Sequence, residues 1–278
     1  MPELPEVETT RRGILPHIKG RTLTGAVVRN GQLRWVVRSD LDHWLKGRQI
    51  DDVERRAKYL LLRLAGGDTL IIHLGMSGSL RLVDADLPPR KHDHIDLLLD
   101  NGMALRYHDP RRFGAFLDQI GDQPHPRLAG LGPEPLSDDF NGATLVKAAK
   151  GKRVAIKKLI MNNAVVVGVG NIYANEALFM AGLHPATAAG DCSAEQLQRL
   201  ADAIKKVLAK AIEMGGTTLR DFVREDGSPG YFAQTLQVYD RADQPCRACG
   251  TPIHRIILGQ RASYYCPVCQ AARKAKSP

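Results

Sequence analysis

The chain has 278 residues, 44% of them hydrophobic, which is enough for two domains of ordinary size and a small appendage. Lysine and arginine number 39 against 30 acidic residues, and the net charge of +9 favours a polyanionic partner, although charge of this size also serves solubility. The sequence has no run of about 18 apolar residues and no apolar segment behind its N-terminus. We therefore expect a cytoplasmic protein with neither a signal peptide nor a membrane partner.

The first predicted element is a helix close to the N-terminus. Its apolar stripe consists of Leu4, Val7, Ile14, Leu15 and Ile18 at helical spacing. Pro5 suits a first helical turn, and Pro16 marks the approximate end of the helix. Arg11 and Arg12 lie outside the stripe, so we expect this helix to bury one face.

Three residues at this N-terminus suit covalent chemistry. Once Met1 is removed, Pro2 carries a free secondary amine, with a pKa near ~8, that can attack an electrophilic sugar carbon. Glu3 and Glu6 stand three residues apart, so on a helix both carboxylates share a face beside that amine. Taken alone, this pattern fits an ordinary helix start better, because acidic residues suit the positive end of the helix dipole.

From about Thr22 to Gln119 the pattern changes to short apolar runs broken by glycine, aspartate and asparagine. Strands are predicted over residues 26–28, 59–62, 69–74, 79–83, 95–99 and 104–107, with turn signals at 65–68 and 100–102. Several short strands separated by regular turns predict a β-sandwich.

A helical region follows a plausible linker at residues 130–135. Its longest apolar face consists of Leu197, Leu200, Ala201, Ile204, Val207, Leu208, Ala211 and Ile212. Ser193 with Gln196 predicts a capping box at the start of this helix, and Gly215 with Gly216 predicts its end. Residues 165–173 form a glycine-bearing entry to another helix, which favours phosphate binding or, alternatively, tight packing. We expect a helical domain over residues 141–214.

Four of the five cysteines form two C-x-x-C pairs separated by 16 residues, namely Cys246, Cys249, Cys266 and Cys269. This spacing predicts one tetrahedral, structural zinc ion per chain. Residues 256–258 and 263–265 predict two strands between the pairs, with Arg261 at the hairpin tip. A ribbon that merely caps the fold is the alternative. Cys192 is expected to be an ordinary reduced thiol.

Residues 2–14 resemble the N-terminus of bacterial formamidopyrimidine-DNA glycosylases, and the resemblance recurs over almost the whole chain. That family excises oxidised purines, 8-oxoguanine above all, and then cuts the DNA strand by β- and δ-elimination. The resemblance implies an α+β multidomain fold: an N-terminal catalytic β-sandwich with flanking helices (1–131), a helix-two-turn-helix domain with a lesion-recognition loop (132–237) and a zinc finger (238–278). We expect a monomer that acts on double-stranded DNA containing oxidised purines.

The resemblance also implies a catalytic set. Pro2 attacks C1′ of the damaged nucleotide, Glu3 acts as the acid/base at the sugar, and Glu6 supports it. Lys58 bridges to the phosphate of the target nucleotide and takes part in β-elimination, although a charge run before a strand is usually a solvated face. Arg261 contacts phosphates near the lesion and assists the second cut.

A DNA-binding set follows from the same resemblance. Three of its residues fill the void left by an everted base: Met76, Arg111 and Phe113. The other four contact the DNA backbone: His92, Lys152, Lys157 and Asn171. A base that is processed must leave the stack, and the gap must be filled. In the absence of the family resemblance, Met76 or Phe113 would more often be a core residue, and His92 would more often be a loop residue without a function. Lys158 stands where the family commonly has proline, which leaves the assignment of Lys157 in place.

Two alternative functions compete with this interpretation. An endonuclease VIII-like glycosylase for oxidised pyrimidines typically has glycine at the position of Leu4 and lacks the Arg111-x-Phe113 pattern. A non-catalytic zinc-finger DNA-binding protein would need neither a free N-terminal proline nor Glu3. The glycine-rich segment Gly215–Phe232 is expected to be mobile, and the resemblance implies that it folds over the everted purine.

Overall fold

The computed structural model describes residues 2–216 and 232–271, except for the side chain of Ala233. The chain forms two compact units, one of Met1–Ala129 with Ile212–Ala233 and one of Gly130–Ala211 with Gln234–Pro278. These units do not assign the limits of functional domains, so the predicted boundaries after residues 131 and 237 remain predictions. Among the helices described, none is long and apolar enough to cross a membrane.

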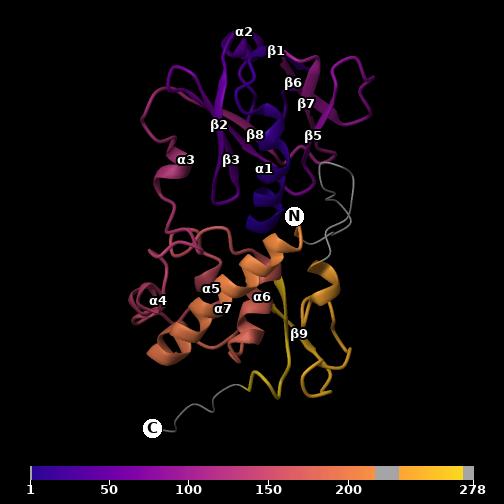
Figure 1. Ribbon diagram of the computed structural model, residues 1–278. Helices are drawn as coiled ribbons and strands as arrows, with labels where there is room; N and C mark the ends of the chain where they lie inside the picture. The colour runs from indigo at the N-terminus through magenta and orange to yellow at the C-terminus, as the bar shows by residue number, and fades with distance from the viewer. Residues whose placement is uncertain (1, 217–231, 272–278) are drawn as a thin grey trace. The chain divides into compact units, whose positions relative to one another are not determined.

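The first unit contains two antiparallel four-stranded sheets (Figure 1). One sheet has the order β1 (Leu23–Val28), β6 (Asp93–Leu99), β7 (Met103–His108), β5 (Ser79–Asp84), and the other has β2 (Ile50–Arg56), β3 (Tyr59–Leu64), β4 (Thr69–His73), β8 (Ala115–Gln119). Residues from both sheets, among them Leu62, Ile72, Leu97 and Leu105, belong to one buried apolar cluster. The predicted β-sandwich is therefore confirmed.

Two strands were missed by the sequence analysis. β2 has the sequence Ile-Asp-Asp-Val-Glu-Arg-Arg, in which only Ile50 and Val53 are buried apolar residues. β8 is short and ends in Asp118 and Gln119, so its apolar run spans only Ala115–Leu117. Pairing with neighbouring strands stabilises both, and pairing partners distant in sequence leave no local signal.

Helix α1 (Leu4–Ile18) contacts β2, β3 and β5, while α2 (Leu41–Leu45) lies against β1 and α3 (Pro126–Ala129) follows the sandwich. The predicted stop at Pro16 was slightly early. The backbone N–H of Lys19 donates to the carbonyl of Leu15 at 3.1 Å, so the last turn closes beyond the proline and the helix ends at Ile18.

The second unit holds α4 (Gly142–Ala149), α5 (Ile156–Ile160), α6 (Asn171–Met180), most of α7 (Ala194–Glu213), the short 3-10 helix η1 (Ala189–Asp191) and the hairpin of β9 (His254–Leu258) with β10 (Arg261–Tyr265). A further 3-10 helix, η2, spans Phe232–Thr235. The predicted capping box is present, because Gln196 N donates to Ser193 Oγ at 3.2 Å and Ser193 N donates to Gln196 Oε1 at 2.8 Å. β10 packs on α6, which joins the cysteine-bearing hairpin to the helices.

Candidate functional site

Pro2, Glu3 and Glu6 are buried together at the start of α1. Glu3 is the N-cap, and a reciprocal capping box links it to Glu6: the Glu6 carboxylate accepts from Glu3 N at 2.9 Å, and the Glu3 side chain accepts from Glu6 N. Each of the two glutamates is only 2% exposed. The helix-start interpretation is therefore correct, and the same geometry places two carboxylates beside the residue with the predicted nucleophilic nitrogen.

A carboxylate next to this group organises three arginines. Glu8 Oε1 accepts from Arg11 at 2.8 Å and Arg12 at 2.9 Å, and Oε2 accepts from Arg55 at 3.1 Å. Burial raises the pKa of Glu8, but the hydrogen bonds from Arg11 and Arg12 outweigh it, so the net shift is downward. Sequence analysis missed this cluster, although the spacing of Glu8 and the two arginines on one helix was a signal for it.

Lys58 lies in the two-residue turn that joins β2 to β3. The preceding residue, Ala57, is buried and adopts a left-handed backbone conformation with φ 54°. Arg55 donates to the carbonyl of Ala57 at 3.0 Å while also binding Glu8. The turn that carries Lys58 is thus connected to α1 through one arginine.

His73 lies beside Lys58, because β4 pairs His73 with Tyr59 and their rings are 4.9 Å apart. Burial lowers the pKa of His73 to about 4, with Lys58 and Arg34 adding to the shift. Its Nδ1 accepts from Gly75 N at 2.9 Å, so the proton of the neutral ring is on Nε2. Sequence analysis did not select His73, and its place beside the Gly-Met turn was the only local signal.

The three predicted void-filling residues lie on two neighbouring turns. Met76 is in the turn between β4 and β5, and Arg111 and Phe113 are in the turn between β7 and β8. The Phe113 side chain is 43% exposed and its ring lies 5.2 Å from the Arg111 guanidinium. A phenylalanine with this exposure is not part of the apolar core, so the alternative of a core role for Phe113 does not apply.

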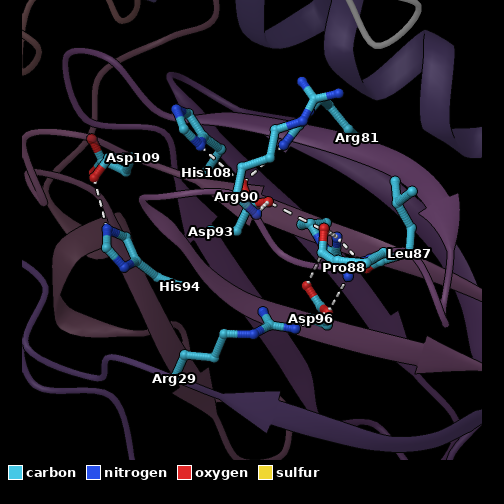
Figure 2. Close-up of polar contacts among 11 residues, drawn as sticks. Arg29, Arg81, Leu87, Pro88, Arg90, Asp93, His94, Asp96, His108 and Asp109 are labelled. Carbon is cyan, nitrogen blue, oxygen red and sulfur yellow. Dashed lines mark hydrogen bonds and ion pairs between the residues drawn. The ribbon is translucent and has the colours of Figure 1, made fainter.

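His92 occupies a turn with φ 75°, with the rings of His94 and His108 6.2 and 6.0 Å away. The strand that follows this turn carries part of a charge cluster that sequence analysis did not predict (Figure 2). Asp93 accepts from Arg81, His108 and Arg90 N at 2.8–2.9 Å, and Asp96 binds Arg106 through two 2.8 Å hydrogen bonds as well as Arg29. These buried pairs fix the strands that flank His92.

In the second unit, Asn171 begins α6 and Lys157 is on α5. Lys157 is only 1% exposed, and its Nζ donates to the carbonyl of Ala262 at 2.9 Å and to Ser263 Oγ at 2.7 Å. Asn171 Nδ2 donates to the same Ala262 carbonyl at 3.1 Å. The structure thus brings Lys157 and Asn171 to the zinc hairpin next to exposed Arg261. Lys152 is exposed in the turn after α4.

The four Sγ atoms of the C-x-x-C pairs lie within 4.8 Å of one another. Two of the separations are 3.4 Å (Cys249 to Cys266) and 3.9 Å (Cys246 to Cys269), close to the roughly 3.8 Å edge of a tetrahedron with Zn–S bonds of ~2.3 Å. The residues therefore fit one closed, structural zinc site.

Sequence profiles of known domains match the chain in three places. Residues 1–116 match the formamidopyrimidine-DNA glycosylase N-terminal domain, residues 131–223 match its H2TH domain, and residues 243–272 match the zinc finger found in FPG and IleRS. This chain belongs to the formamidopyrimidine-DNA glycosylase family. The predicted family, the predicted fold class and the single structural zinc are confirmed, and the endonuclease VIII alternative is not favoured.

Members of the family resemble this chain over nearly their full length. The formamidopyrimidine-DNA glycosylase of Alcanivorax borkumensis is 60% identical over 270 residues, covering 97% of this chain and 100% of the relative. The crystal structure of MutM (FPG) from Thermus thermophilus is 41% identical with a TM-score of 0.87, and the Lactococcus lactis Fpg complex with abasic-site DNA is 33% identical with a TM-score of 0.91. Each covers 98% of this chain and is itself covered completely.

The lesion-recognition loop is predicted over residues 215–232. Residues 217–231 of this loop are outside the residues that the structure describes. At its edges, Gly216 adopts φ 80°, and a Cβ atom there would lie 3.1 Å from Glu6 Oε1. Phe232 N donates to Gly216 O at 3.1 Å. The base of the loop is thus held closed beside the carboxylate of Glu6.

Proposed function

We propose that this chain is a bifunctional DNA glycosylase and AP lyase of base-excision repair that removes oxidised purines, including 8-oxoguanine and formamidopyrimidines, from double-stranded DNA. The observation that carries the proposal is the buried pair of carboxylates, Glu3 and Glu6, beside Pro2. A Lactococcus lactis Fpg has been crystallised with Fapy-dG-containing DNA and with abasic-site DNA, which supports this substrate class. We place the enzyme in the bacterial cytoplasm and expect it to act as a monomer.

The proposed reaction begins at the nitrogen of Pro2. Its lone pair forms a bond to C1′ of the damaged nucleotide, the C1′–N bond breaks, and its electron pair leaves with the base, which takes up a proton. Loss of the amine proton and opening of the sugar at C1′–O4′, with protonation of O4′, give an iminium. Glu3 handles protons at the sugar, and Glu6 holds the Glu3 backbone through the capping box.

Strand cleavage follows from the iminium. Removal of a C2′ proton expels the 3′-phosphate by β-elimination, and δ-elimination then expels the 5′-phosphate, which leaves a one-nucleoside gap. Lys58 is proposed to bridge to the phosphate of the target nucleotide and to take part in β-elimination. Lys58 lies on a tight turn near His73, whose ring is kept uncharged by burial.

DNA binding is proposed to use both units. Met76, Arg111 and Phe113 fill the void of the everted base, as the exposure of Phe113 supports. The proposed backbone contacts are His92, Lys152, Lys157 and Asn171, with Arg261 near the lesion assisting the second cut. The buried Lys157 ammonium already binds the zinc hairpin, so its contribution includes holding that hairpin.

A nicking assay on a duplex with one 8-oxoguanine tests the proposal directly. We expect cleavage that leaves phosphates at both ends of the gap and that exceeds cleavage of a duplex with an oxidised pyrimidine. Binding without nicking would instead assign the chain to the non-catalytic zinc-finger class. Preference for the oxidised pyrimidine would assign it to the endonuclease VIII-like class.

A further inference from the structure

Asp109 is a fully buried carboxylate at the end of β7, just before the turn of Arg111 and Phe113. Its Oδ1 accepts from Ser77 Oγ at 2.8 Å and from Arg111 N at 3.2 Å. Its Oδ2 accepts from Tyr107 Oη at 2.9 Å and from Gly114 N at 2.9 Å. One carboxylate therefore bonds to the turn that holds Met76 and to both ends of the turn that holds Phe113.

The main chain of Asp109 reaches a third turn. Its N–H donates to the carbonyl of His92 at 3.0 Å. Its carbonyl accepts from His94 Nε2 at 2.9 Å, a contact drawn in Figure 2. The turns that carry Met76, His92 and Phe113 are distant in sequence, and Asp109 contacts all three.

The two wedge turns leave little room for adjustment around this residue. A Cβ atom on Gly75 would lie 2.5 Å from Gly114 N, and one on Gly114 would lie 1.7 Å from Tyr107 Oη. Backbone therefore meets backbone where the turns touch. Burial and the neighbouring Asp109 raise the pKa of Tyr107, so its hydroxyl stays a proton donor. A displacement of the Asp109 carboxylate would therefore displace both turns.

We propose that Asp109 is a positioning residue that holds Met76, Arg111 and Phe113 in one register so that they enter the DNA together. This inference rests on the proposed function. A single void in the base stack must receive side chains from two separate turns, and a displacement of about 1 Å at such a site can cost about 100-fold in rate. A buried carboxylate shared by both turns limits that displacement because it fixes the turns to each other.

The test variant is Asp109→Asn. Asparagine keeps the shape but replaces one acceptor oxygen by an NH₂ group, which only donates, so the backbone N–H of either Gly114 or Arg111 loses its acceptor whichever way the amide turns. We expect single-turnover excision of 8-oxoguanine to fall about 10- to 100-fold, while cleavage of a preformed abasic site, which has no base to evert, changes less than about 3-fold. Fluorescence of 2-aminopurine beside the lesion, which reports unstacking, should rise more slowly by the same factor as excision.

The matched control is Asp96→Asn. Asp96 is equally buried, 1% exposed, in the same sheet and binds Arg106 and Arg29 rather than the wedge turns. We expect it to lower stability but to leave the ratio of the two activities unchanged. If Asp109→Asn does not fold, Ser77→Ala carries the test, because it removes only the donor from the Met76 turn. It should shift the ratio in the same direction by a smaller factor.

The role of Asp109 would be overturned if Asp109→Asn showed normal 2-aminopurine kinetics together with either of two results. One is an equal loss of activity on the 8-oxoguanine and abasic-site substrates, and the other is no loss on either. A wild-type protein that cleaves neither substrate would overturn the proposed function instead. The two failures are therefore distinguishable within one set of assays.

Discussion

Lys157 and Asn171 donate hydrogen bonds to one acceptor, the main-chain carbonyl oxygen of Ala262, at 2.9 and 3.1 Å. Asn175 extends the contact, since its Oδ1 accepts from Tyr264 N at 2.8 Å and its Nδ2 donates to the carbonyl of Asn171 at 2.6 Å. Side chains of helices α5 and α6 therefore hold β10 through hydrogen bonds to its main chain. The position of Arg261, the first residue of β10, depends on these contacts as well as on zinc.

Lys157→Met should destabilise the hairpin more than it lowers the non-specific electrostatic affinity for DNA. The change leaves Ser263 Oγ without this donor and removes a charge-assisted bond to Ala262, at a cost of about 1–3 kcal/mol in unfolding free energy. We expect more β-elimination product relative to β,δ-product, because Arg261 is displaced. Urea unfolding and product analysis measure the two effects.

The exposed Lys152 provides the comparison for Lys157. Lys152→Met should flatten the salt dependence of DNA binding by about one unit, with stability within about 0.5 kcal/mol of wild type. Identical stability and product ratios for the two variants would show that Lys157 acts only as a charge.

Zinc is expected to be bound once per chain. Cys249→Ser should lose metal and DNA affinity together, because structural zinc supplies the folding energy of so small a module. Metal analysis of the purified protein and a DNA-binding isotherm check this. Fully active protein that contains no zinc would contradict it.

Lys58→Ala should separate binding from chemistry. Loss of one phosphate contact flattens the salt slope by about one unit, and loss of a group that serves the reaction lowers turnover even at saturating DNA. We expect both effects, measured by single-turnover kinetics on 8-oxoguanine duplex. Normal turnover at saturation would restrict Lys58 to binding.

His73 should make the protein less stable as the pH falls. Its pKa is lowered from 6.5 to about 4 in the folded chain, so between these values the unfolded chain binds a proton that the native chain does not. The stability is present above about pH 6.5 and is lost towards pH 4, by at most about 3 kcal/mol. His73→Gln should flatten the dependence of the unfolding free energy on pH in this window.

The parts of this molecule that sequence predicted have local signals. The cysteine spacing, the Ser193–Gln196 capping box, six of the eight sandwich strands and both strands of the zinc hairpin are each encoded within a few residues. The buried polar links are not. Asp109 meets Ser77 across 32 residues, and Arg55 meets Glu8 across 47. Such pairs form only when the sheets and α1 are assembled, and each member by itself has the pattern of an ordinary polar surface residue.

The roles of individual site residues are also only partly encoded. Phe113 was predicted from the family pattern, and its exposure agrees with a contact role. Lys157 was predicted as a phosphate contact, but the side chain is buried against β10. The residues around Lys157 do not indicate which acceptor its ammonium binds, because that acceptor lies over 100 residues away in the sequence.

The chemistry proposed for Pro2 depends on the nitrogen at the start of the mature chain. An amide nitrogen has no available lone pair, so the proposed chemistry requires that Met1 be removed from active protein. Borohydride added to enzyme and 8-oxoguanine duplex should reduce the iminium and trap a covalent complex, and peptide mapping should locate the adduct on Pro2. Pro2→Gly should keep some activity, because glycine still offers a primary amine.

Blocking the terminus, by an uncleavable extension or by acetylation, should abolish trapping and excision together. DNA binding should remain largely intact, because the proposed contacts with the DNA backbone are made by other residues. The capping box between Glu3 and Glu6 does not involve the terminal nitrogen, so the start of α1 should fold normally. If the blocked enzyme still formed the trapped adduct, the nucleophile would be a lysine, and Lys58 would be the first to test, because the resemblance places it in the active site.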